Sequence, residues 1–410
     1  MSPRKFAKAL LFHTRRAQIR TLSAPREVPW LRRRLRLPAN ETFEPLRDDL
    51  PSVRLVALDP AASLVRPMPL FDGAPPEAVA FFADRRVEST APTYVAEFQD
   101  GVAWGHPTGG IFTAEGRFVP AFTHDPGGPK SHTVWTRLRL PEPRRLAGRT
   151  LYLVTPEATD NFHHWLIDLL PRLGLVQRAG YPVGHFDHVI VNHAHRPYQR
   201  ATLAHLGIPS EKIMVATEDL FLRCESLVVP SLKPNHQTMP AADLAFLRGA
   251  FLQDLPAGTP HRKIFLSRGD ARFRRLTNEA ALKPLLRSHG FEIISPADLD
   301  FMAQARLFAE STMIAGPAGA AFANLVFASP PAHVVEIAPP QWLAAFHWMI
   351  SARSGLEHTI LLGDGPVMRG IPDSSARQAN ITLPREKLEA VLRRPAPMPS
   401  AQKSGVSPSV

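Results

Sequence analysis

From residue 150 onward, short apolar runs alternate with longer stretches in which apolar residues recur every three or four positions. The short runs have the length of buried strands, and the longer stretches have the period of amphipathic helices. Strands that alternate with helices form parallel βαβ units. The first series predicts strands TLYLV (150–154), HVIVN (188–192) and KIMVA (212–216), with helices over residues 162–178 and 197–207.

A second series follows a helix predicted over residues 243–255 and a break with Pro and Gly at 256–260. We therefore expect an α/β protein of two domains joined near residue 256, over residues 41–255 and 256–393. Open α/β sheets bind ligands at the carboxyl ends of their strands. The second series predicts strands at 263–268, 291–295, 312–316 and 333–339, and helices at 278–290, 299–311 and 319–328.

Residues 41–150 and the C-terminal tail do not follow this alternation. Two β-like runs, TYVAEFQDGVAW (93–104) and GIFTAEGRFVPAF (110–122), are separated by Gly and Pro, which predicts a hairpin. The first domain is therefore expected to begin with β structure. The tail, residues 394–410, is rich in Pro and Ser and is expected to be disordered.

The net charge of +11 is concentrated at the N-terminus. Residues 1–36 hold eleven Lys and Arg and one acid, Glu27, and account for ten of these charges. We therefore do not expect a nucleic-acid-binding domain, which would carry its basic residues on a folded face. The basic arm, residues 1–40, either lies on an anionic membrane surface or is a solvated leader.

The cellular compartment follows from cysteine usage and hydropathy. Cys224 is the single cysteine, so no disulfide within the chain is possible. No secretory signal is recognisable, and no apolar run approaches the length of a membrane span. We expect a cytoplasmic protein, peripheral at the inner face of the membrane if the basic arm binds there.

Polar residues occupy one flank of the helix predicted in TDNFHHWLIDLLPRL, residues 159–173. Asn161, His164 and Asp168 fall on that flank, and the last two are four residues apart, so their side chains can meet. A carboxylate beside an imidazole orients the ring and raises its basicity, which suits a general base. A structural His–Asp contact, with Asn161 as a helix N-cap, explains the same pattern without a site.

Predicted strand ends in the second domain carry residues that suit a nucleotide diphosphate. Arg268 ends one strand and Arg275 follows it, and arginine can bind diphosphate oxygens in pairs. Gly316 and Gly319 open a helix after another strand, where free N–H groups favour phosphate. Glu336 lies near a third strand end, where a carboxylate can accept hydrogen bonds from ribose hydroxyls. The structural alternatives are a surface charge cluster, tight strand–helix packing and a salt bridge from Glu336 to an arginine.

No metal site or cofactor is predicted. His193 and His195 alternate at a strand end, but no further ligand follows at the spacing of a zinc site. The glycines form neither G-x-G-x-x-G nor a P-loop, which argues against an NAD-dependent oxidoreductase. Asn278 and Asp300 are explained by the N-termini of the helices that they precede.

In combination, the segments DNFHHWLIDLLPRL, KIFLSRGDARFRRLTNE and 291–339 resemble glycosyltransferase family 61, including its bacterial capsular-polysaccharide-type members. Their order and spacing match over about residues 150–340. The resemblance implies a GT-B fold, in which two Rossmann-like domains face each other across a cleft and the second holds the nucleotide sugar. It also implies an inverting enzyme that requires no metal, with a UDP-sugar as the usual donor.

By position, the resemblance places Asn161, His164 and Asp168 on a helix that faces the cleft. His164 or Asp168 would deprotonate an acceptor hydroxyl of a glycan, which attacks the anomeric carbon of the donor during polysaccharide biosynthesis. Many members have a histidine before the second glycine unit, whereas this chain reads GPAGAA from residue 316. That departure leaves open a non-catalytic nucleotide- or glycan-binding homologue in an assembly complex. The resemblance assigns donor binding to Arg268, Arg275, Gly316, Gly319, Asn324 and Glu336.

Overall fold

The computed structural model describes most of the chain between residues 42 and 393. The basic arm lies almost entirely outside the described residues, and the tail from residue 394 lies wholly outside them. Among the described residues, no helix combines the length and the apolar character needed to cross a membrane. The described residues are 28, 30, 34, 37–38, 42–106, 108–123, 132–137, 139–155, 157–233, 238–253, 259–368 and 375–393.

The chain folds into two compact units. Unit 1 comprises Met1–Ala62 and Thr90–His236, and unit 2 comprises Ser63–Ser89 and Gln237–Val410. Unit 2 thus includes residues 63–89 and 237–255, which the sequence analysis placed with the first domain. Residues 63–89 belong to unit 2 because the strand that they contain, β3 (Leu70–Phe71), pairs with the sheet of that unit.

The sheet of unit 1 has four parallel strands at its centre and one edge. From that edge they are β10 (Ile213–Val215), β9 (His188–Val191), β8 (Arg144–Tyr152) and β11 (Phe221–Pro230). β5 (Thr93–Gln99) is antiparallel to β11, and β1 (Val53–Asp59) is antiparallel to β5. The three strands predicted for this region are confirmed as β8, β9 and β10, and they alternate with helices as expected.

The hairpin predicted between residues 93–104 and 110–122 is also confirmed. β6 (Val102–Trp104) pairs antiparallel with β7 (Ile111–Phe112), with Val102 opposite Phe112. β6 continues the line of β5 along β11, because both strands pair with β11 in the same register. β1, β5, β6 and β7 of the β-rich start therefore complete the sheet of unit 1.

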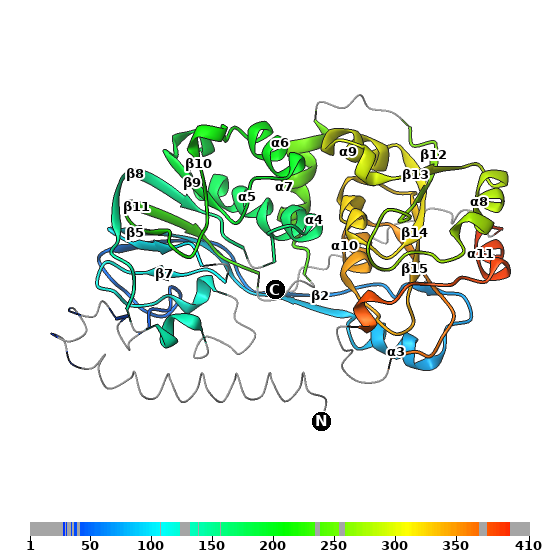
Figure 1. Cartoon of the computed structure of the whole chain (residues 1–410), viewed down its shortest axis with the longest axis horizontal. Helices are drawn as coiled ribbons and strands as arrows, with labels where there is room; N and C mark the ends of the chain where they lie inside the picture. Colours follow the sequence, from blue (N-terminus) through cyan, green and yellow to red (C-terminus); the bar gives the residue numbers. More distant parts are fainter. Residues whose placement is uncertain are drawn as a thin grey trace, which may run out of the picture. The chain divides into compact units, whose positions relative to one another are not determined.

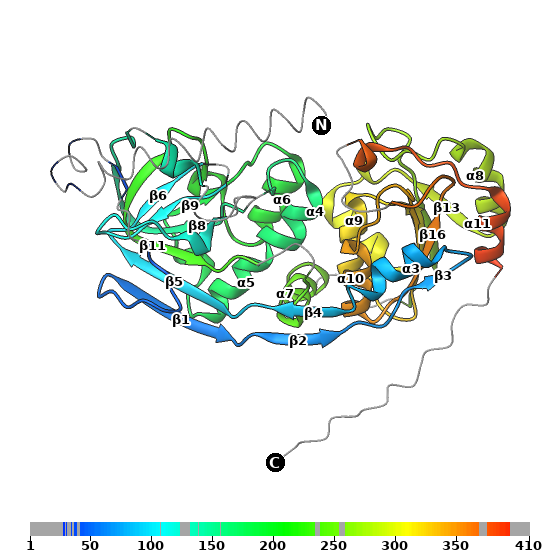
Figure 2. The same ribbon diagram turned by 90° about the horizontal axis from the view of Figure 1, so that it is seen from below.

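Helices of unit 1 connect the parallel strands. α4 (Phe162–His164), a π-helical segment (Trp165–Leu169) and α5 (Pro171–Arg178) lead from β8 to β9, and α6 (Pro197–His205) leads from β9 to β10. α4, α5 and α6 lie side by side next to the sheet in both views (Figures 1 and 2). The helix predicted over residues 162–178 is thus present, but its middle is π-helical.

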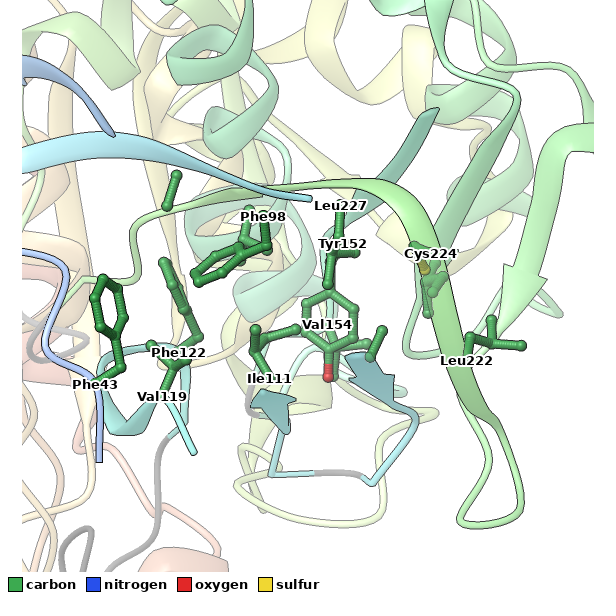
Figure 3. Packing of buried hydrophobic residues seen from close by; sticks show 14 of the residues in the cluster. Phe43, Phe98, Ile111, Val119, Phe122, Tyr152, Val154, Leu222, Cys224 and Leu227 are labelled. Carbon is green, nitrogen blue, oxygen red and sulfur yellow. The ribbon is translucent and has the colours of Figure 1, made fainter. Parts of the chain in front are cut away.

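The core of unit 1 joins the β-rich start to the βαβ part. Figure 3 shows Phe43, Phe98 and Phe122 from the start of the unit in one cluster with Tyr152 and Cys224 from β8 and β11. Phe98 and Phe122 meet edge to face, with ring centroids 6.1 Å apart. Burial raises the pKa of the Cys224 thiol to about 11, so this cysteine is an inert core residue.

The sheet of unit 2 is entirely parallel. Its order is β13 (Phe291–Ile294), β12 (Arg262–Leu266), β14 (Ser311–Pro317), β15 (His333–Ala338), β16 (Glu357–Leu362) and β3. The four strands predicted for this region are confirmed as β12 to β15. Parallel strands are joined by crossovers that place helices over the faces of the sheet, which explains why these strands read as continuous apolar runs.

Helices cover both faces of this sheet. α8 (Glu279–Ser288) and α11 (Arg385–Leu392) lie on one face, while α9 (Phe301–Ala309) and α10 (Phe346–Ser354) lie on the other (Figures 1 and 2). α7 (Ala241–Leu252) and α3 (Pro76–Ala83) also belong to unit 2. The helix predicted over residues 319–328 is a 3₁₀ helix, Ala320–Phe327. The α/β class is confirmed in both units.

Candidate functional site

Unit 1 has a topological switch point at the carboxyl edge of its sheet. The chain moves from β8 to β9 to β10 in one direction, whereas β11 lies on the other side of β8. In open α/β sheets, ligands bind at the carboxyl ends of the strands at such a point. The buried guanidinium of Arg172, on α5, donates hydrogen bonds to the carbonyl oxygens of Tyr152 (3.3 Å) and Pro230 (2.6 Å). Arg172 therefore anchors the helix that carries His164 and Asp168 to the ends of both strands.

The π-helical turn at Trp165–Leu169 has an identifiable cause. Pro171 has no N–H and cannot donate to the carbonyl oxygen of Ile167, four residues earlier. The N–H of Leu170 donates instead to Trp165, five residues back, at 3.0 Å. The freed carbonyl of Ile167 accepts a hydrogen bond of 2.6 Å from Lys233 Nζ, just beyond β11. Such π-turns are frequent at functional sites, and this one contains Asp168.

His164 lies between two carboxylates. Its Nδ1 is 2.7 Å from Asp168 Oδ2, and its Nε2 is 2.8 Å from Glu157 Oε2. The side chains of His164 and Asp168 are 10% and 4% exposed, whereas that of Glu157 is 59% exposed. Lys233 Nζ lies 4.0 Å from the other oxygen of Asp168. The contact predicted between His164 and Asp168 is present, and Glu157 and Lys233 extend it.

The two carboxylates decide the charge of His164. Burial alone would lower its pKa, but the hydrogen bonds to Asp168 and Glu157 and their negative charges outweigh burial and raise the pKa to about 9. At neutral pH the ring is therefore an imidazolium that donates to both carboxylates. Asn161 is exposed and caps the helix, because its Oδ1 accepts the N–H of His163 at 3.0 Å. The N-cap predicted as an alternative for Asn161 is confirmed.

Unit 2 has its own switch point, between β12 and β14. β13 lies on one side of β12 and β14 on the other, which is the strand order of flavodoxin-like sheets. Arg268 follows β12, and Gly316 lies in β14 beside it. A Cβ atom on Gly316 would lie 2.8 Å from the carbonyl oxygen of Leu266, so this position requires glycine for close strand packing. The close contact lies between two strands, whereas the alternative drawn from the sequence was tight packing of a strand against a helix.

Arg268 and Gly319 are brought together at this point. A Cβ atom on Gly319 would overlap the guanidinium of Arg268, whose Nη2 donates to the carbonyl oxygen of Phe273 at 3.0 Å. Burial and the neighbouring charge of Arg274 lower the pKa of Arg268 to about 10, and it is still a cation at neutral pH. Gly319 therefore provides the space in which the guanidinium lies.

Arg274 is the second cation at this switch point, and it is not among the residues predicted from the sequence to bind the donor. Its backbone φ of 54° is in the left-handed region, and its Nε donates to the carbonyl oxygen of Ala318 at 3.1 Å. Its guanidinium lies 4.8 Å from the ring centre of Trp342. Arg275, which was predicted to bind the donor, is exposed, and its backbone N–H donates to Asn380 Oδ1 at 3.0 Å.

Glu336 is fully engaged within unit 2. Its two oxygens lie 2.7 Å from His347 Nδ1 and 3.1 Å from His358 Nε2, and the carboxylate is buried. Burial raises its pKa, but the two histidines outweigh burial and lower the pKa to about 2. The partners are two histidines, so the alternative of a salt bridge to an arginine was wrong. Burial lowers the pKa of Arg274, and the negative charge of Glu336 offsets part of that decrease.

Asn324 and Asn278 have structural partners. Asn324 is buried and donates to Gln304 Oε1 on α9 at 2.9 Å and to the carbonyl oxygen of Ala321 at 3.1 Å. Asn278 makes no side-chain capping bond, so the N-cap prediction was wrong. Its amide instead pairs with both the N–H and the carbonyl group of Leu383, which ties α8 to the chain before α11. Asp300 caps α9 as predicted, since Oδ1 accepts the N–H of Ala303.

Among the described residues, no group of three or more His, Cys, Asp or Glu side chains is placed to hold a metal ion. His193 and His195 are close, with their Nδ1 atoms 3.2 Å apart. His195 Nε2 also lies 2.7 Å from Asp160 Oδ1, which is itself bonded to Arg196. These contacts lie at the surface, at the end of β9.

Both switch points lie largely inside one family match. Residues 162–335 match the family model described as Glycosyltransferase 61. The matched segment runs from the start of α4 to β15 and includes His164, Asp168, Arg268 and the two glycines. The match supports the family predicted from the sequence, and with it glycosyltransferase activity. No curated protein matches the chain.

Sequence reasoning missed Glu157, Lys233 and Arg274 at the two switch points. The sequence does indicate that a donor such as Lys233 is needed. Pro171 within a helical pattern leaves one carbonyl group without its usual N–H partner, so another group must donate to it. The sequence gives no such indication for Glu157, because it precedes the helix by five residues and reaches His164 from a turn with a φ of 65°. Arg274 differs from its neighbours only in its backbone conformation, which the residue pattern does not encode.

Proposed function

We propose that this protein is an inverting glycosyltransferase that moves a sugar from a UDP-linked donor to a hydroxyl group of a glycan. The observation that carries the proposal is the pair of cations, Arg268 and Arg274, held at the β12–β14 switch point of a parallel sheet. Ligands of open α/β sheets bind at such points. A second, different cluster of carboxylates and an imidazolium at the switch point of unit 1 supplies groups for proton transfer.

The donor diphosphate is assigned to unit 2. A departing nucleoside diphosphate gains negative charge in the transition state, and fixed cations in a partly buried site stabilise that charge. Arg268 and Arg274 are both pre-organised, because Phe273 and Ala318 carbonyl groups hold their guanidinium groups. Two arginines can supply the charge that a divalent cation supplies elsewhere, so we propose that the reaction needs no metal. In this scheme Asn324 and Glu336 support the loop and strand from within.

The acceptor is assigned to unit 1. A group in the cluster of His164, Asp168 and Glu157 removes the proton from the acceptor hydroxyl, whose oxygen attacks the anomeric carbon while the bond to the diphosphate breaks. One displacement of this kind inverts the anomeric configuration. Two parallel-sheet units, each with a switch point, support the GT-B class for the chain.

The biological setting follows from the same resemblance and from the basic arm. We propose a role in capsular polysaccharide biosynthesis on the cytoplasmic side, with residues 1–36 binding anionic lipid. The arm holds ten of the eleven net positive charges, and clustered Lys and Arg near a membrane each contribute about 1 kcal/mol of binding. Sedimentation with anionic vesicles, with and without residues 1–36, tests the membrane role.

The first experiment is calorimetric titration of the full chain with UDP, GDP and CMP, with and without chelator. We expect metal-independent binding of UDP that Arg268→Ala weakens at least about tenfold, since charge-assisted hydrogen bonds contribute about 1.5–3 kcal/mol. Arg287→Ala, at an exposed position on α8, is the matched control and should leave the affinity unchanged. Absence of binding of all three nucleotides by the wild-type chain would contradict the proposal.

A second candidate is a non-catalytic nucleotide- or glycan-binding homologue. The observation that favours it is the stretch Pro317–Ala318, where many family members have a histidine. Here Pro317 ends β14 and Ala318 follows it, so neither position supplies an imidazole. Nucleotide binding without turnover of any donor would favour this candidate.

A further inference from the structure

Glu157 stands apart from the other residues of its region in backbone conformation. Among the residues that the structure describes, a positive φ at a residue other than glycine occurs at Asp100, Glu157 and Arg274. Two of these three lie at the two switch points. Such conformations cost on the order of 1–3 kcal/mol and cluster at active sites and ligand-binding segments. The turn that contains Glu157 therefore has the backbone conformation expected of a ligand-binding segment.

The strained turn directs Glu157 to the outer nitrogen of His164. In a relay of a carboxylate, an imidazole and a hydroxyl, the outer nitrogen is the one that meets the substrate. Here Glu157 Oε2 already lies 2.8 Å from Nε2, and Asp168 Oδ2 lies 2.7 Å from Nδ1. Both ring nitrogens of His164 are thus hydrogen-bonded to carboxylates. An acceptor hydroxyl could bond to Nε2 only if it displaced Glu157.

Exposure separates the three side chains of this cluster. Asp168 is 4% exposed and His164 10%, whereas Glu157 is 59% exposed. A glycan acceptor arrives from solvent, so the exposed carboxylate is the member of the cluster that it can touch. The carboxylate of Glu157 can therefore meet an acceptor hydroxyl from the solvent side while Oε2 keeps its bond to His164.

We infer that Glu157 is the group that accepts the proton of the acceptor hydroxyl, with His164 and Asp168 as positioning residues behind it. This inference rests on the proposed transferase function and deepens it. In the step, the acceptor O–H bond breaks and its proton moves to Glu157. The acceptor oxygen forms a bond to the anomeric carbon, the bond from that carbon to the diphosphate oxygen breaks, and the nucleoside diphosphate leaves with the electron pair.

The remainder of the cluster fixes Glu157 in place through successive contacts. The imidazolium of His164 holds Oε2, and Asp168 holds the imidazolium. Lys233 lies 4.0 Å from Asp168 and bonds to the carbonyl group of Ile167 in the same π-turn. The ring of His163, a further titratable group, lies edge to face against that of His164, with 5.4 Å between the ring centroids. A single charged unit therefore extends from the end of β11 to the exposed carboxylate.

The test compares Glu157→Gln with wild type in the full chain. Release of UDP is measured from UDP-glucose, UDP-galactose and UDP-N-acetylglucosamine, with water and methyl glycosides as acceptors. We expect kcat to fall at least about 100-fold, because a positioned base contributes about 10²–10⁴-fold to the rate, while the affinity for UDP is unchanged. Glu211→Gln, an exposed carboxylate in unit 1, is the matched control and should retain full activity.

A second readout needs no substrate. The pKa of His164, followed by NMR in the full chain with labelled histidine, should fall in Glu157→Gln because the ring then has one carboxylate partner in place of two. His164→Gln should lower kcat and shift the acid limb of the pH–rate profile, as expected for a positioning residue. Glu157→Asp should recover part of the activity that Glu157→Gln loses.

The outcomes separate the inference from the function on which it rests. If wild type turns over a donor and Glu157→Gln stays within about threefold of it, the inference is wrong and the transferase function stands. If wild type binds UDP but transfers no sugar, both the catalytic function and the inference fail, and the non-catalytic candidate remains. Loss of turnover in Glu157→Gln with UDP affinity and folding intact supports the inference.

Discussion

Arg274 and Arg275 are neighbours in the sequence, but they differ in what their side chains do. Arg274 has a left-handed backbone and is stacked on Trp342, and its guanidinium bonds to the carbonyl oxygen of Ala318 and lies near Arg268. Arg275 is exposed. Pattern and resemblance favoured Arg275, because neither carries information on the sign of φ. We therefore assign the second diphosphate contact to Arg274.

This assignment gives a paired prediction. Arg274→Ala should weaken UDP binding at least about tenfold in calorimetric titration, because it removes a fixed cation and a hydrogen bond that holds the loop after β14. Arg275→Ala should change the affinity less than about twofold. Equal effects of the two substitutions would contradict the assignment, and a larger effect of Arg275→Ala would restore the choice made from the sequence.

Among the secondary-structure elements, the π-turn at Trp165–Leu169 shows best how sequence determines the site. Pro171 withholds one N–H, the helix widens by one residue, and Lys233 takes the free carbonyl group of Ile167. A regular α-helix would still place His164 and Asp168 four residues apart. It would not provide the backbone carbonyl that brings Lys233 beside Asp168. The proline therefore contributes to the charge balance of the cluster as well as to the shape of the helix.

Pro171→Ala tests this role. Alanine restores the N–H donor and has a helix propensity about 3 kcal/mol more favourable than proline in a helix interior, so the regular α-helix gains stability relative to the π-turn. We expect a folded protein whose Tm is at least that of wild type but whose kcat is reduced at least about tenfold. If a crystal structure of the variant shows a regular α-helix with Lys233 no longer bonded to Ile167, and activity is nevertheless unchanged, the π-turn is not required.

An element is predictable from the sequence when the contacts that form it join residues that are close together in the chain. The strands and helices after residue 150 follow from apolar periodicity, and the predicted His164–Asp168 contact follows from helical spacing. The pairing of β3 with β16 and the position of β1 and β5 do not, because they depend on partners that are distant in the chain. Asn278 illustrates the same limit, since Leu383, far along the chain, competes with the local cap for its amide.

For the whole molecule, the ionic clusters around Glu336 in unit 2 and His164 in unit 1 act in opposite directions on the pH dependence of stability. Glu336 has a pKa lowered to about 2 from 4.5, so its contribution is present above pH 4.5 and is lost as pH falls toward 2. His358 has a lowered pKa because it is buried, so the folded state also loses stability below about pH 6.5, where the unfolded histidine gains a proton. Unit 2 therefore carries the acid sensitivity.

His164 in unit 1 acts in the other direction. Its pKa is raised from 6.5 to about 9, so its contribution is complete below pH 6.5 and is lost as pH rises through 9. The contribution is on the order of 3–4 kcal/mol when complete, because each unit of pKa shift corresponds to about 1.4 kcal/mol. In calorimetric melts, the Tm difference between wild type and His164→Gln should be largest near pH 6 and should shrink between pH 7 and 9.5. A difference that is constant over this range would show that His164 is neutral in the folded protein, and the charge assigned to the Glu157–His164–Asp168 cluster would have to be abandoned.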